Sequence, residues 1–247
     1  MRFAVCPHDM VRQMQTWLEL ATYLQRELQE PVVLDPVTDF HAFYDQVLPY
    51  AELAYLNPLD AWRWAQTHQA QPLCGTELYD EVVFVAAPGQ RTDLSALQGQ
   101  PLAAVDQQFA TYLGLALLQE HHITPGEIVW KGSWIGVIRA LMRGEAPYGL
   151  LYADAYEGLS RLAKEQVEVV HRSQSRLATH MLMLRPDKAS RRADVAGFFL
   201  RMHQNPETAG LVDALRIGRW TPNPDLEAIA QVIEHARSLL PALEQPA

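Results

Sequence analysis

The chain has 247 residues, of which 49% are apolar and 20% are charged, and its formal net charge is −9. This composition is typical of a globular protein with a sizeable core, and the negative charge argues against a groove for nucleic acid. No apolar run approaches the roughly 20 residues that span a bilayer, so we expect no direct membrane insertion.

The start of the chain reads as a strand and not as a signal segment. This predicts either a cytoplasmic protein or the mature portion of an exported, periplasmic one. Two cysteines, Cys6 and Cys74, are too few for a disulfide scaffold.

Strand and helix patterns alternate along the first quarter of the chain. Strands are predicted at residues 3–6, 32–34 and 53–56, with helices at 11–29 and 38–47 between them. Another helix begins at Asn57-Pro58, because proline is tolerated at the first helical position. This βαβαβ order predicts a mostly parallel sheet flanked by helices.

The remaining sequence predicts a second lobe, after which the chain returns to the first lobe. Further strands are predicted at 73–76, 81–87, 102–105, 127–130, 148–152, 167–170 and 179–184, and helices at 110–120, 192–203, 207–216 and 225–239. The strands at 81–87 and 179–184 should carry the chain between lobes. We therefore expect lobe one to comprise residues 1–85 plus 178–247, lobe two to comprise 86–177, and a ligand cleft to lie between them.

The stretch from Lys131 to Asp154 holds the densest set of signals. Ser133 can cap a helix whose apolar residues recur at helical spacing, and Gly144 stands where that helix should stop. A strand follows and ends at Tyr152. In open α/β sheets ligands lie at the carboxyl ends of strands and the amino ends of helices, so Ser133-Trp134 and Tyr152 to Asp154 are candidate ligand contacts.

Three motifs resemble one known family. They are Gly132-Ser133 through Arg139-Ala140 with Gly144-Glu145 following, residues 51–58 (AELAYLNP), and the strand at 79–87. Their order and spacing resemble the phosphate/phosphonate-type periplasmic solute-binding proteins of ABC transporters, over residues 2–200. The resemblance implies a two-lobed, type II periplasmic-binding-protein-like α/β clamshell that captures a small solute, without a cofactor and without catalysis.

Strand-to-helix turns and the resemblance together nominate the ligand-binding residues. They are Cys6, Pro7, Tyr55, Asn57 and Tyr79 in lobe one, and Gln108, Phe109, Thr111, Ser133, Trp134, Tyr152 and Asp154 in lobe two. Two departures from the family pattern stand out. Its run of Ser and Thr at a helix start is reduced to Thr111, and its His and acidic residue after Gly-Ser are Trp134 and Ile135 here. These changes predict a larger, less charged or partly aromatic solute in place of a doubly charged phosphonate.

Each nomination has a simpler alternative. Tyr55 and Trp134 can be packing residues, and Asp154 can cap a helix. Cys6 and Cys74 lie at predicted strand ends, where they could bind a soft metal, but two buried structural thiols are the expectation and no metal site is predicted.

Three functions remain open at this stage. The first is solute capture for an ABC permease. The second is ligand sensing together with a membrane sensor kinase, and the third is a cytosolic biosynthetic enzyme on the same fold. The sequence shows no acid and base pair, nucleophile elbow or zinc-spaced cluster that would favour the enzyme.

Overall fold

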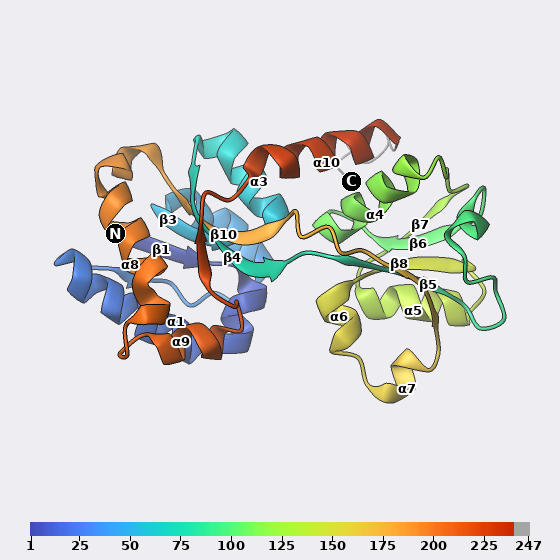
Figure 1. The fold of residues 1–247 in the computed structure, drawn as a ribbon, viewed down its shortest axis with the longest axis horizontal. Helices are drawn as coiled ribbons and strands as arrows, with labels where there is room; N and C mark the ends of the chain where they lie inside the picture. Colours follow the sequence, from blue (N-terminus) through green and yellow to red (C-terminus); the bar gives the residue numbers. More distant parts are fainter. Residues whose placement is uncertain (240–247) are drawn as a thin grey trace. The chain divides into compact units, whose positions relative to one another are not determined.

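In the computed structural model, which describes residues 1–239, the chain forms two compact units (Figure 1). Unit 1 comprises residues 1–79 and 179–226, and unit 2 comprises residues 80–178 together with the described residues from 227 onward. The division therefore falls at Tyr79/Asp80 on the outward path, six residues before the expected boundary at 85/86.

Unit 1 is built on a six-stranded sheet in the order β11-β4-β10-β3-β1-β2. Its strands are β1 (Arg2–Val5), β2 (Val33–Leu34), β3 (Leu53–Leu56), β4 (Gln71–Tyr79), β10 (Thr179–Leu184) and β11 (Trp220–Pro222). Strands β1, β2 and β3 run parallel, as the opening pattern predicts. Because β10 runs antiparallel to both β3 and β4, the sheet is mixed.

The helices of unit 1 match most of the predicted ranges. They are α1 (Pro7–Leu28), α2 (Phe40–Ala42), α3 (Pro58–His68), α8 (Arg192–Arg201) and α9 (Ala209–Leu215). One difference lies in the helix expected at 38–47, where α2 gives way to a π-helical turn over Phe43–Val47. Another is β11, a short strand that the sequence analysis did not predict.

Unit 2 is built on a five-stranded sheet in the order β7-β6-β8-β5-β9. The strands are β5 (Val82–Ala86), β6 (Leu102–Val105), β7 (Ile128–Lys131), β8 (Tyr148–Tyr152) and β9 (Glu168–Arg172). Strands β6, β7 and β8 are parallel, whereas β5 is antiparallel to β8 and β9. Its helices are α4 (Phe109–Glu120), α5 (Trp134–Met142), α6 (Ala153–Glu157) and α7 (Arg161–Lys164).

The last described helix corrects the expected domain assignment. Helix α10 (Leu226–Leu239) was expected to close lobe one, but its residues from Glu227 belong to unit 2. Amphipathic spacing predicts a buried stripe, here Ile229, Ile233 and Ala236, without indicating which core that stripe meets.

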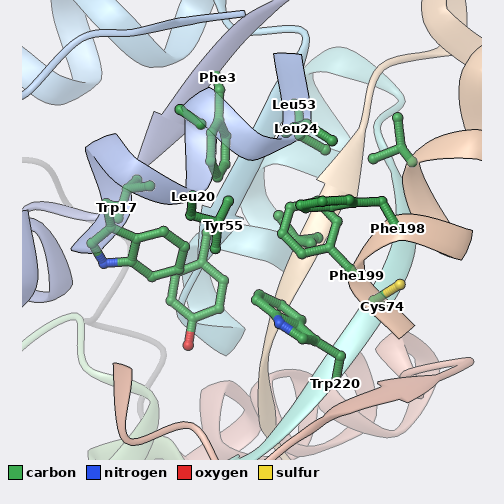
Figure 2. Packing of buried hydrophobic residues seen from close by; sticks show 14 of the residues in the cluster. Phe3, Trp17, Leu20, Leu24, Leu53, Tyr55, Cys74, Phe198, Phe199 and Trp220 are labelled. Carbon is green, nitrogen blue, oxygen red and sulfur yellow. The ribbon is translucent and has the colours of Figure 1, made fainter. Parts of the chain in front are cut away.

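Each unit has its own hydrophobic core. In unit 1, α1 lays Trp17, Leu20 and Leu24 on the sheet, and Phe199 of α8 packs against Trp220 with ring centroids 4.7 Å apart (Figure 2). In unit 2, Val137 and Leu141 of α5 pack on the strands. Burial of this kind contributes about 25 cal/mol per Å² of apolar surface, which is why both units are compact.

Gly149 of β8 allows α5 to approach the sheet. A Cβ atom at this position would lie 2.6 Å from Val137 Cγ1 and 3.1 Å from Leu141 Cδ1. We therefore expect Gly149→Ala to lower the free energy of unfolding by about 1 to 3 kcal/mol through overpacking, measured by urea denaturation. Gly132→Ala is the matched control, because a Cβ there meets nothing within 4 Å. Equal stability of the two variants would contradict this account of the α5 contact.

Candidate functional site

In each unit, the carboxyl ends of three parallel strands lie at one edge of the sheet. In unit 1 this edge carries the turns from β1 to α1 and from β3 to α3, and in unit 2 it carries the turns that follow β6, β7 and β8. Helix N-termini at such an edge present unsatisfied backbone N–H groups. Most of the nominated residues lie in these turns or at the first residues of the helices that follow them, whereas Tyr55 lies inside β3 and Tyr79 at the end of β4.

The two turns of unit 1 repeat one pattern. Cys6 caps α1, Pro7 follows it, and Asp9 is the third helical residue. Asn57 caps α3, Pro58 follows it, and Asp60 is again the third helical residue. Both carboxylates are buried, with 9% of Asp9 and 3% of Asp60 exposed.

Asp60 is held by groups from three parts of unit 1. The Tyr44 hydroxyl, from the π-helical turn, lies 3.0 and 2.9 Å from the two carboxylate oxygens, and Asn57 Nδ2 donates to Oδ2 at 2.7 Å. Arg63 Nη1 is 3.7 Å from Oδ1. Burial raises the pKa of Asp60 despite these partners, and burial beside this carboxylate raises the pKa of Tyr44.

Asn57 is used for positioning within unit 1. Its Oδ1 accepts from the backbone N–H of Asp60 at 2.9 Å, as an N-cap side chain does, and its Nδ2 is 3.7 Å from Cys6 Sγ. With Nδ2 also donating to the Asp60 carboxylate, the amide ties the two turns together. These bonds support the edge, and the expected role of Asn57 as a direct ligand contact stays a prediction.

Tyr55 occupies the core. Its side chain is 0% exposed, and its ring lies beside Trp17 and Trp220 (Figure 2), with centroids 4.7 and 5.7 Å away. The His180 ring lies 5.8 Å away between centroids. The alternative of a core tyrosine thus describes this position, because a fully buried ring has no surface to offer a solute. Pro7 is buried as well.

Asp9 pairs with His180, the second residue of β10. His180 Nδ1 is 3.5 Å from Asp9 Oδ2, and both side chains are mostly buried. His180 precedes Met181, the residue of β10 that pairs with Leu56 at the end of β3, so β10 brings it to the same edge. The sequence analysis nominated neither residue, nor Tyr44 or Asp60.

The two cysteines do not meet. Cys6 follows β1 whereas Cys74 lies in β4, three strands away in the sheet, a separation of roughly 14 Å at about 4.8 Å per strand. Within residues 1–239 there is no group of three or more His, Cys, Asp or Glu side chains that could hold a metal ion. Both thiols are free and buried.

The turn before α4 in unit 2 presents backbone N–H groups to a ligand, and its one hydroxyl group is already used within the fold. The Thr111 hydroxyl donates to the Val105 carbonyl oxygen at 2.7 Å, and Thr111 and Phe109 are both buried. Gln108 caps α4 through its backbone and is exposed, with no side-chain capping bond. An anion at this helix start would therefore meet backbone N–H groups and Gln108.

The α5 turn places aromatic rings beside a capped helix start. Ser133 Oγ accepts from the backbone N–H of Gly136 at 3.1 Å, and Gly132 and Ser133 are exposed. The half-buried rings of Trp134 and Tyr152 lie 6.4 Å apart between centroids. Asp154 is in the first turn of α6, where a carboxylate can also serve to stabilise the helix start, as the alternative interpretation of this residue expects.

Both thiols should be unreactive in the folded protein. Burial, with Asp9 and Asp60 nearby, raises the pKa of Cys6 well above its usual value, and burial raises the pKa of Cys74 to about 12. In mildly alkaline buffer neither forms the reactive thiolate. We expect no reaction with a disulfide reagent such as DTNB over minutes, followed by two equivalents in guanidinium chloride. Rapid labelling of either cysteine in the native protein would contradict the buried environment.

Comparison with known proteins places this arrangement in context. A family model described as ABC transporter, phosphonate, periplasmic substrate-binding protein matches residues 3–226. No curated protein matches. No helix within residues 1–239 is long and apolar enough to cross a membrane.

Solved structures with this fold share little sequence with the chain. XAC2383 from Xanthomonas citri bound to ATP superposes with a TM-score of 0.75 at 15% identity, covering 97% of this chain and 98% of that one. PhnD1 from Prochlorococcus marinus in complex with methylphosphonate gives 0.71 at 13% identity, covering 97% of each chain. A putative sulfonate-binding SsuA from Methylobacillus flagellatus gives 0.69 at 13%, covering 99% and 87%. With the family match spanning most of its length, the chain belongs to the periplasmic substrate-binding proteins of phosphonate-type ABC transporters.

Proposed function

We propose that the chain captures a small solute in the periplasm and delivers it unchanged to an ABC permease. The solute has one anionic group and a planar or apolar body. Family membership supports capture and delivery. The cleft between lobes that the sequence analysis expects stays a prediction, and the proposal is argued within unit 2.

The observation that carries the solute class is the pairing of aromatic rings with an exposed helix start. Trp134 and Tyr152 lie beside the Ser133 cap of α5, where backbone N–H groups and the helix dipole favour an anion. The Lys131 side chain lies next to Gly136 in the first turn of α5, but its ammonium pairs with Glu145. The positive charge available to a doubly ionised group is therefore low.

The α4 helix start supports the same solute class. Because the Thr111 hydroxyl already donates within the fold, this turn offers fewer donors than a run of free hydroxyls would. Fewer donors favour a monoanion over a dianion. The related structures with ATP and with methylphosphonate illustrate that this fold accommodates both a large aromatic anion and a small one.

A thermal-shift screen tests the solute class. The purified chain is screened against phosphate, phosphonates, sulfonates and aromatic carboxylates, and a solute at a hundred times its dissociation constant should add about 2.7 kcal/mol of stability. We expect aromatic monoanions to stabilise more than phosphate or methylphosphonate. Stabilisation by small phosphonates alone would overturn the solute class while supporting capture.

Trp134→Ala should weaken binding of the best solute from that screen by at least tenfold, because the substitution removes one aromatic wall. The expected loss of about 1.4 kcal/mol or more is measured by isothermal titration calorimetry. Trp130→Ala is the matched control, since Trp130 is a 39% exposed aromatic residue of the same unit that lies in β7 and not at a helix start. Equal affinities of Trp134→Ala and the parent would remove Trp134 from the site.

A further inference from the structure

The base of the Lys131 side chain lies beside the start of α5 in unit 2. Strand β7 ends at Lys131, and α5 begins at Trp134 with Ser133 as its cap. A Cβ atom placed on Gly136, in the first turn of α5, would lie 3.3 Å from Lys131 Cβ and 3.3 Å from Ser133 Oγ. Because a lysine side chain is a long and flexible stem, its ammonium can reach the capped helix start from this position.

The structure holds this ammonium away from the helix start. Lys131 Nζ donates a hydrogen bond to Glu145 Oε2. Glu145 follows the last residue of α5, Met142, and its backbone N–H donates to the Ala140 carbonyl oxygen at 2.9 Å. The stem of Lys131 therefore runs along α5 from its first turn toward its C-terminal end.

Glu145 is shared between two cations at the surface. Its Oε2 accepts from Lys131, and its Oε1 lies 3.8 Å from Arg143 Nη1. The hydrogen bond from Lys131 lowers the pKa of Glu145, and Arg143 lowers it further, so the carboxylate is ionised in neutral buffer. Because the side chains of Lys131 and Glu145 are 23% and 36% exposed, their pair contributes little to stability. The position of the ammonium thus depends on a weak interaction that a single substitution removes.

The position of this ammonium affects which anions the start of α5 favours. The N-terminus of a helix provides about half an elementary charge, which suits a group with one negative charge. An ammonium released to the same place would add a full positive charge. A dianion would gain more from that added charge than a monoanion of the same shape, because the attraction is proportional to the product of the charges.

We propose that Glu145 is a specificity-determining residue, which draws the Lys131 ammonium away from the start of α5 and thereby makes this helix start prefer a monoanion to a dianion. Glu145 acts through Lys131 and does not itself touch the solute. This inference rests on the proposed function, because it concerns the anionic group of the solute beside Ser133 and Trp134.

Two compounds with the same aromatic body test the inference. In mildly alkaline buffer benzenesulfonate carries one negative charge and phenylphosphonate carries two. Both are titrated calorimetrically into the parent, Glu145→Gln and Glu165→Gln. Glu165 is a 51% exposed carboxylate of the same unit that pairs with Arg161, so its variant carries the same change in net charge away from α5. The parent should bind benzenesulfonate more tightly than phenylphosphonate.

In Glu145→Gln the affinity for phenylphosphonate relative to benzenesulfonate should rise at least fivefold, which corresponds to about 1 kcal/mol. Glu165→Gln should keep the parent's ratio. The double variant Glu145→Gln/Lys131→Met should lose the gain, because methionine keeps an apolar stem and removes the charge. An unchanged ratio in Glu145→Gln would overturn the inference while leaving solute capture intact, and so would a gain that survives in the double variant.

Backbone amide NMR signals locate the bound anion. The signals of Trp134 and Gly136, at the start of α5, should shift when either compound is added. Binding that leaves both signals unchanged would overturn this inference together with the solute site of unit 2. A parent that prefers phenylphosphonate would contradict the inference as well. If neither compound binds any variant, the inference fails, and the broader thermal-shift screen decides solute capture separately.

Discussion

The direction of parallel strands is the constraint from which the rest of the structure follows. A crossover helix must return the chain to the start of the next parallel strand, so every strand of the set ends at one edge and every following helix begins there. Both units obey this rule, with β1 and β3 in unit 1 and β6, β7 and β8 in unit 2. Each unit thereby gathers the positive ends of its helices along one edge.

The two units treat these helix starts differently. In unit 2, α5 begins with an exposed Gly132 and Ser133 and a pair of aromatic rings, and α4 begins with an exposed Gln108. In unit 1, α1 and α3 each carry a buried aspartate at the third helical position. One fold thus carries an edge open to an anion and an edge already supplied with anions, and the difference depends on a few side chains at equivalent turn positions.

Burying Asp60 has a cost, which the raised pKa of this carboxyl reflects. Desolvation favours the protonated form of Asp60, so its pKa is higher in the folded chain than in the unfolded chain. The contribution of Asp60 to stability therefore declines as the pH rises from the unfolded-state pKa through the folded-state pKa. The Tyr44 hydroxyl and the Asn57 amide offset part of that cost. A π-helical turn brings Tyr44 to this position, and such turns are often found near functional sites.

The sequence by itself determined the elements, the family and the location of candidate turns. Apolar periodicity predicts β3, β6, β8 and β10 with their observed bounds, and the motifs around Gly132 and Tyr55 indicate the family that the comparison confirms. Local patterns suffice for these features because the periodicity of a strand or helix depends only on residues close together in the sequence.

Only the tertiary structure decided what each side chain does. It put Tyr55 in the core, engaged the Thr111 hydroxyl with Val105, and assigned most of α10 to unit 2. It also joined Asp60 to Tyr44 and Asp9 to His180, partners separated by 16 and 171 residues in the chain. Burial and pairing depend on which strands become neighbours, and that arrangement is a property of the whole sheet which no local pattern contains.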